Sequence, residues 1–128
     1  MDAGLLFGDF PLMGGDFIPR GLLTLKPTWL NFFENATTVQ FDHRILAETL
    51  GCLVLFLFYF QRRNLKNIPK SLSFGFNFLL GITTIQISLG IATLMNQVPT
   101  NLAASHQLGS LTLLSTFIYL THFLKKRF

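Results

Sequence analysis

The chain has 128 residues, of which 50% are hydrophobic and only 12% are charged, and its mean hydropathy is +0.48. That balance is too apolar for an ordinary soluble domain and indicates an all-α integral membrane protein in contact with the lipid bilayer. Most of the positive charge sits in two short clusters beside apolar segments, which is typical of membrane-edge anchors and excludes a nucleic-acid-binding surface.

Residues 1–40 are predicted to form a loop-like segment along the outer membrane interface. Pro11, Pro19 and Pro27 interrupt any long helix. Aromatic residues such as Trp29 and Phe32 suit the headgroup level of a bilayer. The segment has neither the basic start and apolar core of a secretory signal nor the composition of a transit peptide.

Residues 41–128 are predicted to form a membrane domain of three transmembrane helices, over residues 41–60, 72–95 and 102–124. Each is an apolar run of about the length that crosses a bilayer. Cys52, the only cysteine, lies inside the first run and is interpreted as a packing residue, so no intrachain disulfide is expected.

The basic clusters orient these three helices. One cluster follows the first helix and contains Arg62, Arg63, Lys66 and Lys70, and the other is Lys125, Lys126 and Arg127. Basic residues accumulate on the cytoplasmic or matrix side of membrane proteins. We therefore expect a multi-pass protein with its C-terminus on that inner side and residues 1–40 on the outer side.

Two histidines lie at the same depth in two of the predicted helices. His43 precedes Arg62 by 19 residues, and His106 precedes Lys125 by 19 residues. Nineteen helical residues span roughly 28 Å, about one hydrocarbon core. Both imidazoles should therefore lie near the outer face, where a pair on neighbouring helices can ligate a metal or a heme. Each alone can also be a polar interfacial anchor.

Two further polar residues near the level of the histidine pair, Arg44 and Glu48, have two interpretations each. Arg44 can pair with a heme propionate or reach lipid phosphates. Glu48 is costly at its depth, which suggests a function unless it stays hydrated. His122, near the inner end, is interpreted as an interfacial residue and not a ligand.

Small and polar residues mark two helix faces. Gly109 and Ser110 follow His106 by one turn and leave room either for a flat macrocycle or for close helix packing. A stripe along the second helix faces the bundle interior, lining a cavity or making interhelical hydrogen bonds. Its members are Thr83, Gln86, Gly90, Thr93 and Gln97.

Four stretches of the chain resemble one family, the heme A synthases, which oxidise heme O to heme A for cytochrome c oxidase. They are MDAGLLFGDFPLM, PTWLNFFENATTVQFDHRILAE, TTIQISLGIATLM and VPTNLAASHQLGSL, in family order. The second and fourth resemble the mitochondrial and alphaproteobacterial branch. Members have eight transmembrane helices in two four-helix halves, each with a histidine pair. The resemblance implies that this chain is the C-terminal half, with its three helices part of a four-helix heme-binding bundle.

The resemblance implies that His43 and His106 are the axial ligands of a heme b. It also implies heme O as substrate, a ferredoxin-type electron donor and an N-terminal half in the same or a separate chain. The N-terminal half has a catalytic glutamate three residues before its first histidine. Here that position is Gln40, so no catalytic residue is expected in this half, and the chain alone is expected to be inactive.

Two alternatives remain open. The chain can instead be a non-catalytic bis-histidine heme-binding module, a cytochrome b-like electron-transfer or assembly subunit. The resemblance implies the mitochondrial inner membrane, with a bacterial plasma membrane as the alternative.

Overall fold

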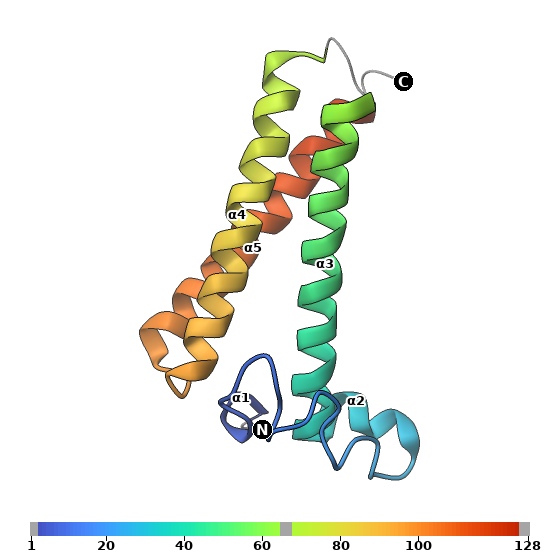
Figure 1. Cartoon of the computed structure of the whole chain (residues 1–128), viewed down its shortest axis with the longest axis vertical. Coiled ribbons are helices and arrows are strands. Elements are labelled where there is room, and N and C mark those ends of the chain that lie inside the picture. Colours follow the sequence, from blue (N-terminus) through green and yellow to red (C-terminus); the bar gives the residue numbers. More distant parts are fainter. Residues whose placement is uncertain (1–2, 65–67, 126–128) are drawn as a thin grey trace.

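The computed structural model describes residues 3–64 and 68–125, and in that part the chain is helical with no strand beyond one isolated bridge between Met13 and Asp16. Three long helices dominate: α3 (Ala36–Asn64), α4 (Lys70–Met95) and α5 (Thr100–Lys125), as Figure 1 shows. Short helices α1 (Ala3–Leu6), η1 (Thr28–Leu30) and α2 (Asn31–Glu34) precede them. The all-helical class expected from composition is therefore confirmed.

The long helices occupy the predicted stretches but extend beyond the predicted bounds. The largest difference is at α3, which begins at Ala36 and not at residue 41. Asn35 explains this start, because its side-chain oxygen accepts the backbone N–H of Thr38 at 3.1 Å and so caps the helix. The apolar run marks only the part of a helix that suits hydrocarbon, whereas polar turns add length at both ends.

Two of the long helices, α3 and α4, are long and apolar enough to cross a membrane. Only 6% of the α3 span is buried within the described structure, so it is not the core helix of a soluble protein. α5 does not meet the same criterion over its described residues, and the third crossing stays a prediction. Of the two basic clusters, Lys66, Lys126 and Arg127 lie outside the described residues.

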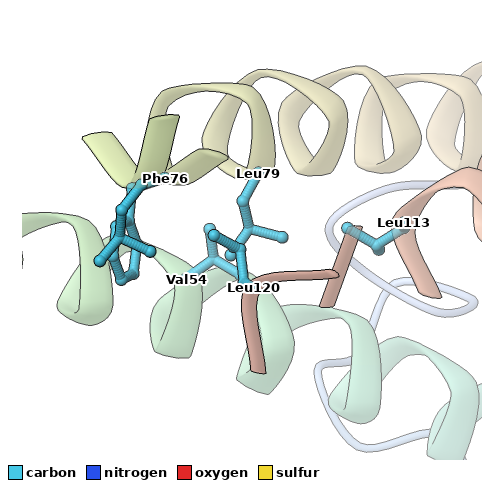
Figure 2. Close-up of a cluster of buried hydrophobic side chains, with 6 residues drawn as sticks. Val54, Phe76, Leu79, Leu113 and Leu120 are labelled. Atoms are coloured by element: carbon cyan, nitrogen blue, oxygen red, sulfur yellow. The ribbon is translucent and has the colours of Figure 1, made fainter. Parts of the chain in front are cut away.

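The hydrophobic core joins the three long helices towards the end that holds Asn64 and Lys70, named the inner end after the predicted topology, and the opposite end is named the outer end. Figure 2 shows side chains from α3, α4 and α5 meeting there; the buried members are Val54, Leu72, Phe76, Leu79, Leu113 and Leu120. Gly75 permits the close approach of α4 and α5, because a Cβ at that position would lie 2.5 Å from Cδ2 of Leu120. Cys52 is not part of this core: it is exposed on α3, so its interpretation as a packing residue is wrong within the described structure.

At the outer end α3 and α4 diverge, and the N-terminal segment lies beside them (Figure 1). Asn31 holds the loop that precedes it in the chain. Its side chain is fully buried, donates to the carbonyls of Leu25 and Thr28, and accepts the N–H of Leu25. Trp29 and Phe33 remain more than 60% exposed on this part of the chain. Such exposed aromatic side chains suit a membrane interface, and that location stays a prediction.

Candidate functional site

A pocket of about 360 Å³ lies between the outer ends of α3 and α4, beside α1 and the N-terminal end of α5. The three site residues predicted from the sequence, His43, Arg44 and His106, all line it. Most of the remaining wall is apolar, and its members are Ala3, Gly4, Phe10, Val39, Ala47, Ile87, Gly90, Ile91, Leu94 and Val98, with Gln40, Glu48 and Thr93 as polar neighbours.

The two imidazoles lie beside each other in the wall of this pocket, in an edge-on arrangement. His43 comes from α3 and His106 from α5, and their ring centroids are 6.2 Å apart with an angle of 77° between the ring planes. A metal–imidazole bond is about 2.0 Å long, so two imidazoles on opposite sides of one metal ion have centroids roughly 6.3 Å apart. The observed separation therefore suits axial ligation of a single metal ion.

The set of donors favours a group that brings its own equatorial ligands. Within residues 3–64 and 68–125, no group of three or more His, Cys, Asp or Glu side chains could hold a metal ion. Two imidazoles leave four positions of an octahedral iron to be filled, and a porphyrin supplies four nitrogens in one plane. The apolar walls and the paired imidazoles therefore fit a heme.

His106 lies in a cradle formed by α4. A Cβ at Gly90 would come within 2.9 Å of the His106 Cε1 atom, so only glycine leaves room for this imidazole. One turn away, the side-chain amide of Gln86 donates to the backbone carbonyl of His106 at 2.8 Å. The Nδ1 atom of His106 is buried and has no hydrogen-bond partner among the described residues.

The contacts of Gly109, three residues after His106, favour close helix packing over space for a macrocycle. A Cβ at Gly109 would collide with the side-chain oxygen of Gln86, so this glycine permits close packing of α5 on α4. Ser110 is exposed and its hydroxyl donates to the carbonyl of Gln107 on its own helix. Neither residue lines the pocket.

The predicted polar stripe on α4 is divided between two roles. Gln86 and Gly90 contact His106, as described, whereas Thr83 and Thr93 are buried and donate their hydroxyls to carbonyls one turn earlier in the same helix. Gln97 is exposed in the turn after α4. The stripe thus faces the bundle along α4 and leaves it at the turn.

Arg44 has partners that the sequence did not predict. Its Nη1 atom donates to the carbonyls of Pro11 and Leu12 at 2.8 and 2.7 Å, and its Nη2 atom donates to the carbonyl of Asp9 at 3.1 Å. The guanidinium also lies over the Phe10 ring, 5.5 Å from its centroid. Contact with a propionate stays a prediction for Arg44, whose main observed role is to hold the N-terminal segment.

Gln40 and Asp9 reinforce the same segment. The Gln40 side-chain amide donates to the carbonyl of Phe7 at 2.8 Å. The Asp9 carboxylate accepts the backbone N–H groups of Gly14 and Gly15, at 3.0 and 3.2 Å. These hydrogen bonds favour the ionised form and lower the pKa of Asp9 below its usual value, with a smaller contribution from Arg44. No sequence signal marked Asp9 as a neighbour of the site, and Gln40 was noted only for its place three residues before His43.

The two remaining candidates lie in different places. Glu48 lines the pocket one turn beyond Arg44 and is exposed. His122 is exposed near the inner end of α5, beside Phe123, and does not line the pocket. The depth argument therefore distinguished the paired histidines from the third.

Comparison with known proteins identifies relatives over nearly the whole chain. Residues 1–118 match the COX15-CtaA family, described as cytochrome oxidase assembly protein. The chain is 44% identical to the heme A synthase COX15 of Mus musculus over 126 residues, and 44% identical to the heme A synthase of Nitrosospira multiformis over 125 residues. The human heme A synthase COX15 is 43% identical over 126 residues. No solved structure shows significant similarity.

The matches cover nearly all of this chain but only part of each relative. Each of these matches spans 98% of this chain but only 30% of the mouse and human proteins and 35% of the bacterial one. The chain therefore spans about a third of the length of the curated relatives that it matches.

Proposed function

The chain belongs to the COX15-CtaA family of cytochrome oxidase assembly proteins, and on that premise we propose that it is the C-terminal, heme b-binding part of a heme A synthase. The whole protein would oxidise the methyl group of heme O to the formyl group of heme A. In this proposal the three long helices all cross the membrane, as part of a four-helix bundle within an eight-helix protein.

One observation carries the proposal: two imidazoles from different helices line one pocket at the centroid spacing of a bis-histidine metal site. His43 and His106 are the proposed axial ligands. Gly90 supports this assignment because it leaves space for the His106 ring, and Gln86 holds the backbone at the same residue. The apolar wall suits the faces of a porphyrin.

In this proposal the residues of the chain bind the heme and shield it from water, and none is assigned to proton transfer. When bound, heme b supplies reversible one-electron chemistry at its iron. The two histidines would fix its position, and the apolar walls would exclude water. Gln40, three residues before His43, already binds the carbonyl of Phe7, so its amide has a structural role.

The second candidate function is a non-catalytic bis-histidine heme module that transfers electrons or assists assembly, and the structural role of Gln40 fits it equally well. The two candidates share the same heme site and differ in the partner. A heme A synthase needs the N-terminal half with its own histidine pair, heme O and a ferredoxin-type electron donor. A cytochrome b-like module needs neither the N-terminal half nor heme O.

Two apolar helices and relatives in both eukaryotes and bacteria support a membrane location. We place the chain in the mitochondrial inner membrane, with the bacterial plasma membrane as the alternative. Its C-terminal end would face the matrix or the cytoplasm, and the pocket would lie near the opposite face.

The first test is a reduced-minus-oxidised optical spectrum of the purified protein in detergent, with the variants His43→Ala, His106→Ala and His122→Ala. We expect a low-spin b-type spectrum that is lost in the first two variants. His122→Ala is the matched control, because it removes a histidine of α5 outside the pocket, and it should retain the spectrum.

Heme binding that survives both pocket variants would contradict the proposed ligands. Production of heme A then separates the two functions. If the protein with its N-terminal half converts heme O only while His43 and His106 are intact, the synthase assignment holds. A b-type spectrum without any such conversion favours the electron-transfer module.

A further inference from the structure

The N-terminal segment bridges both sides of the pocket at its outer end. On one side, Arg44 and Gln40 of α3 bind the carbonyls of four residues in it: Phe7, Asp9, Pro11 and Leu12. On the other side, a Cβ at Gly4 would lie 3.0 Å from Cγ2 of Val98, in the turn between α4 and α5. Ala3, Gly4 and Phe10 of this segment line the pocket itself.

Hydrogen bonds and packing contacts within the N-terminal segment hold it in one shape. The Asp9 carboxylate binds the N–H groups of Gly14 and Gly15, and Met13 and Asp16 exchange two backbone hydrogen bonds. Met13 is 1% exposed despite its place in a loop of the molecular surface. Gly14, at φ 65°, packs against the ring of Phe7. These contacts give residues 3–16 a defined shape.

We propose that residues 3–16 form a cap, fastened by Arg44 and Gln40, that restricts the access of water-soluble ligands to the pocket from the outer aqueous side. Arg44 is thus a positioning residue, whose planar guanidinium suits three carbonyls at once. The effect on a bound heme rests on the proposed function, whereas the fastening of the cap does not.

Hydrogen–deuterium exchange of the full chain in detergent tests the fastening without any heme. Removing charge-assisted hydrogen bonds to the three carbonyls should raise exchange in residues 3–16 by about tenfold or more in Arg44→Met. Gln40→Leu should raise it less, since only one hydrogen bond is lost. Arg62→Met is the matched control, because Arg62 also lies over an aromatic ring, that of Phe58, but at the inner end of α3.

The rate at which ferricyanide, a water-soluble anion, oxidises the reduced, heme-loaded protein tests the access function, because this electron transfer needs no free position on the iron. Arg44→Met should accelerate it severalfold, and Arg62→Met should leave it unchanged. A disulfide between Gly4→Cys and Val98→Cys, in a Cys52→Ser background, provides a test that keeps both fastening residues, because the Gly4–Val98 spacing is within disulfide reach. It should slow oxidation by ferricyanide, and prior treatment with a thiol reductant, removed before the measurement, should restore the rate.

The outcomes separate the two claims. Equal exchange in Arg44→Met and the parent overturns the cap. Faster exchange with an unchanged rate of ferricyanide oxidation, or a disulfide that does not slow this oxidation, overturns its control of access. Faster exchange in a protein that binds no heme supports the cap and refutes the proposed function instead.

Discussion

At the scale of single residues, Gly90 is the position where the smallest change should disturb the histidine pair. Gly90→Ala places a methyl group within 2.9 Å of the His106 ring, which must then shift from its observed place beside His43. We expect the heme content of the purified protein to fall severalfold and the low-spin spectrum to weaken. The measurement is the heme-to-protein ratio with the optical spectrum.

Gly81→Ala is the matched control for this prediction. Gly81 lies on the same helix, and a Cβ there meets nothing within 4 Å. The substitution should leave heme content unchanged and favour the helix by up to about 1 kcal/mol. Equal heme content in Gly90→Ala and Gly81→Ala would show that His106 tolerates displacement and would count against a tight ligand geometry.

Asp9 gives the turn of the cap a pH dependence. Its pKa in the folded chain is lowered, mainly by the hydrogen bond from Gly14, below the ordinary value of 3.8. The stabilisation is therefore fully present above pH 3.8 and is lost as the pH falls through the lower folded value. The rate of hydrogen–deuterium exchange at the backbone amides of Gly14 and Gly15, corrected for the pH dependence of the intrinsic exchange rate, should rise in that acid range.

Asp9→Asn should remove most of this dependence, because the amide cannot change its charge. The exposed Asp16, whose carboxylate lies 3.9 Å from Arg20, provides the control variant Asp16→Asn. Persistence of the acid transition in Asp9→Asn would assign it to another group.

The histidine pair was predictable from the sequence, whereas the partners of Arg44 were not. A helix has a fixed rise, so counting residues from His43 and His106 to the basic clusters compares their depths directly. Arg44 binds carbonyls 32 to 35 residues earlier in the chain, in a segment of prolines and glycines without periodicity. Neither spacing nor composition places such a loop over a particular helix.

At the scale of elements, the long helices follow from apolar runs, and their ends depend on local polar contacts. Asn35 extends α3 upstream, and Pro69 precedes the first residue of α4. The sequence also suggested small residues for close packing, but only the structure shows which partner each one meets. Gly75 meets Leu120, Gly109 meets Gln86, and Gly90 meets a histidine.

Gly75→Ala should weaken the contact between α4 and α5. The new Cβ would lie 2.5 Å from Cδ2 of Leu120, and overpacking of this kind costs about 1–3 kcal/mol. The gain in helix propensity, about 1 kcal/mol, offsets only part of that cost. Denaturant unfolding in detergent should therefore show a lower free energy of unfolding.

Leu120→Val in the same chain provides the control, since it shortens the side chain that collides. The double variant should be more stable than the sum of the two single effects predicts, which is a favourable coupling in a double-mutant cycle. Additive effects would indicate that Gly75 and Leu120 do not limit the approach of the two helices.

At the scale of the whole molecule, the structure separates a packed end from an open one. Val54, Leu79 and Leu120 close the inner half, whereas the outer half contains the pocket and relies on the N-terminal segment to connect α3 with the α4–α5 turn. A segment that is distant in sequence therefore fastens the open end, and in the cap proposal it restricts access to the site from the outer aqueous side.

The proposed topology makes a prediction for the membrane-embedded chain. In a Cys52→Ser background, Asp16→Cys and Gln97→Cys should react with a membrane-impermeant maleimide from the outer side, since both positions are exposed beside the outer ends of the helices. Asn64→Cys, at the inner end of α3, should react only after the membrane is permeabilised, because the adjacent basic residues belong on the inner side.

Lys125→Cys should also require permeabilisation, and this position tests the third crossing, which composition alone does not establish for α5. Labelling of Lys125→Cys from the outer side would leave two crossings. It would also mean that α5 does not run from the outer face to the inner one, and the matched depth of His43 and His106 would lose its physical basis.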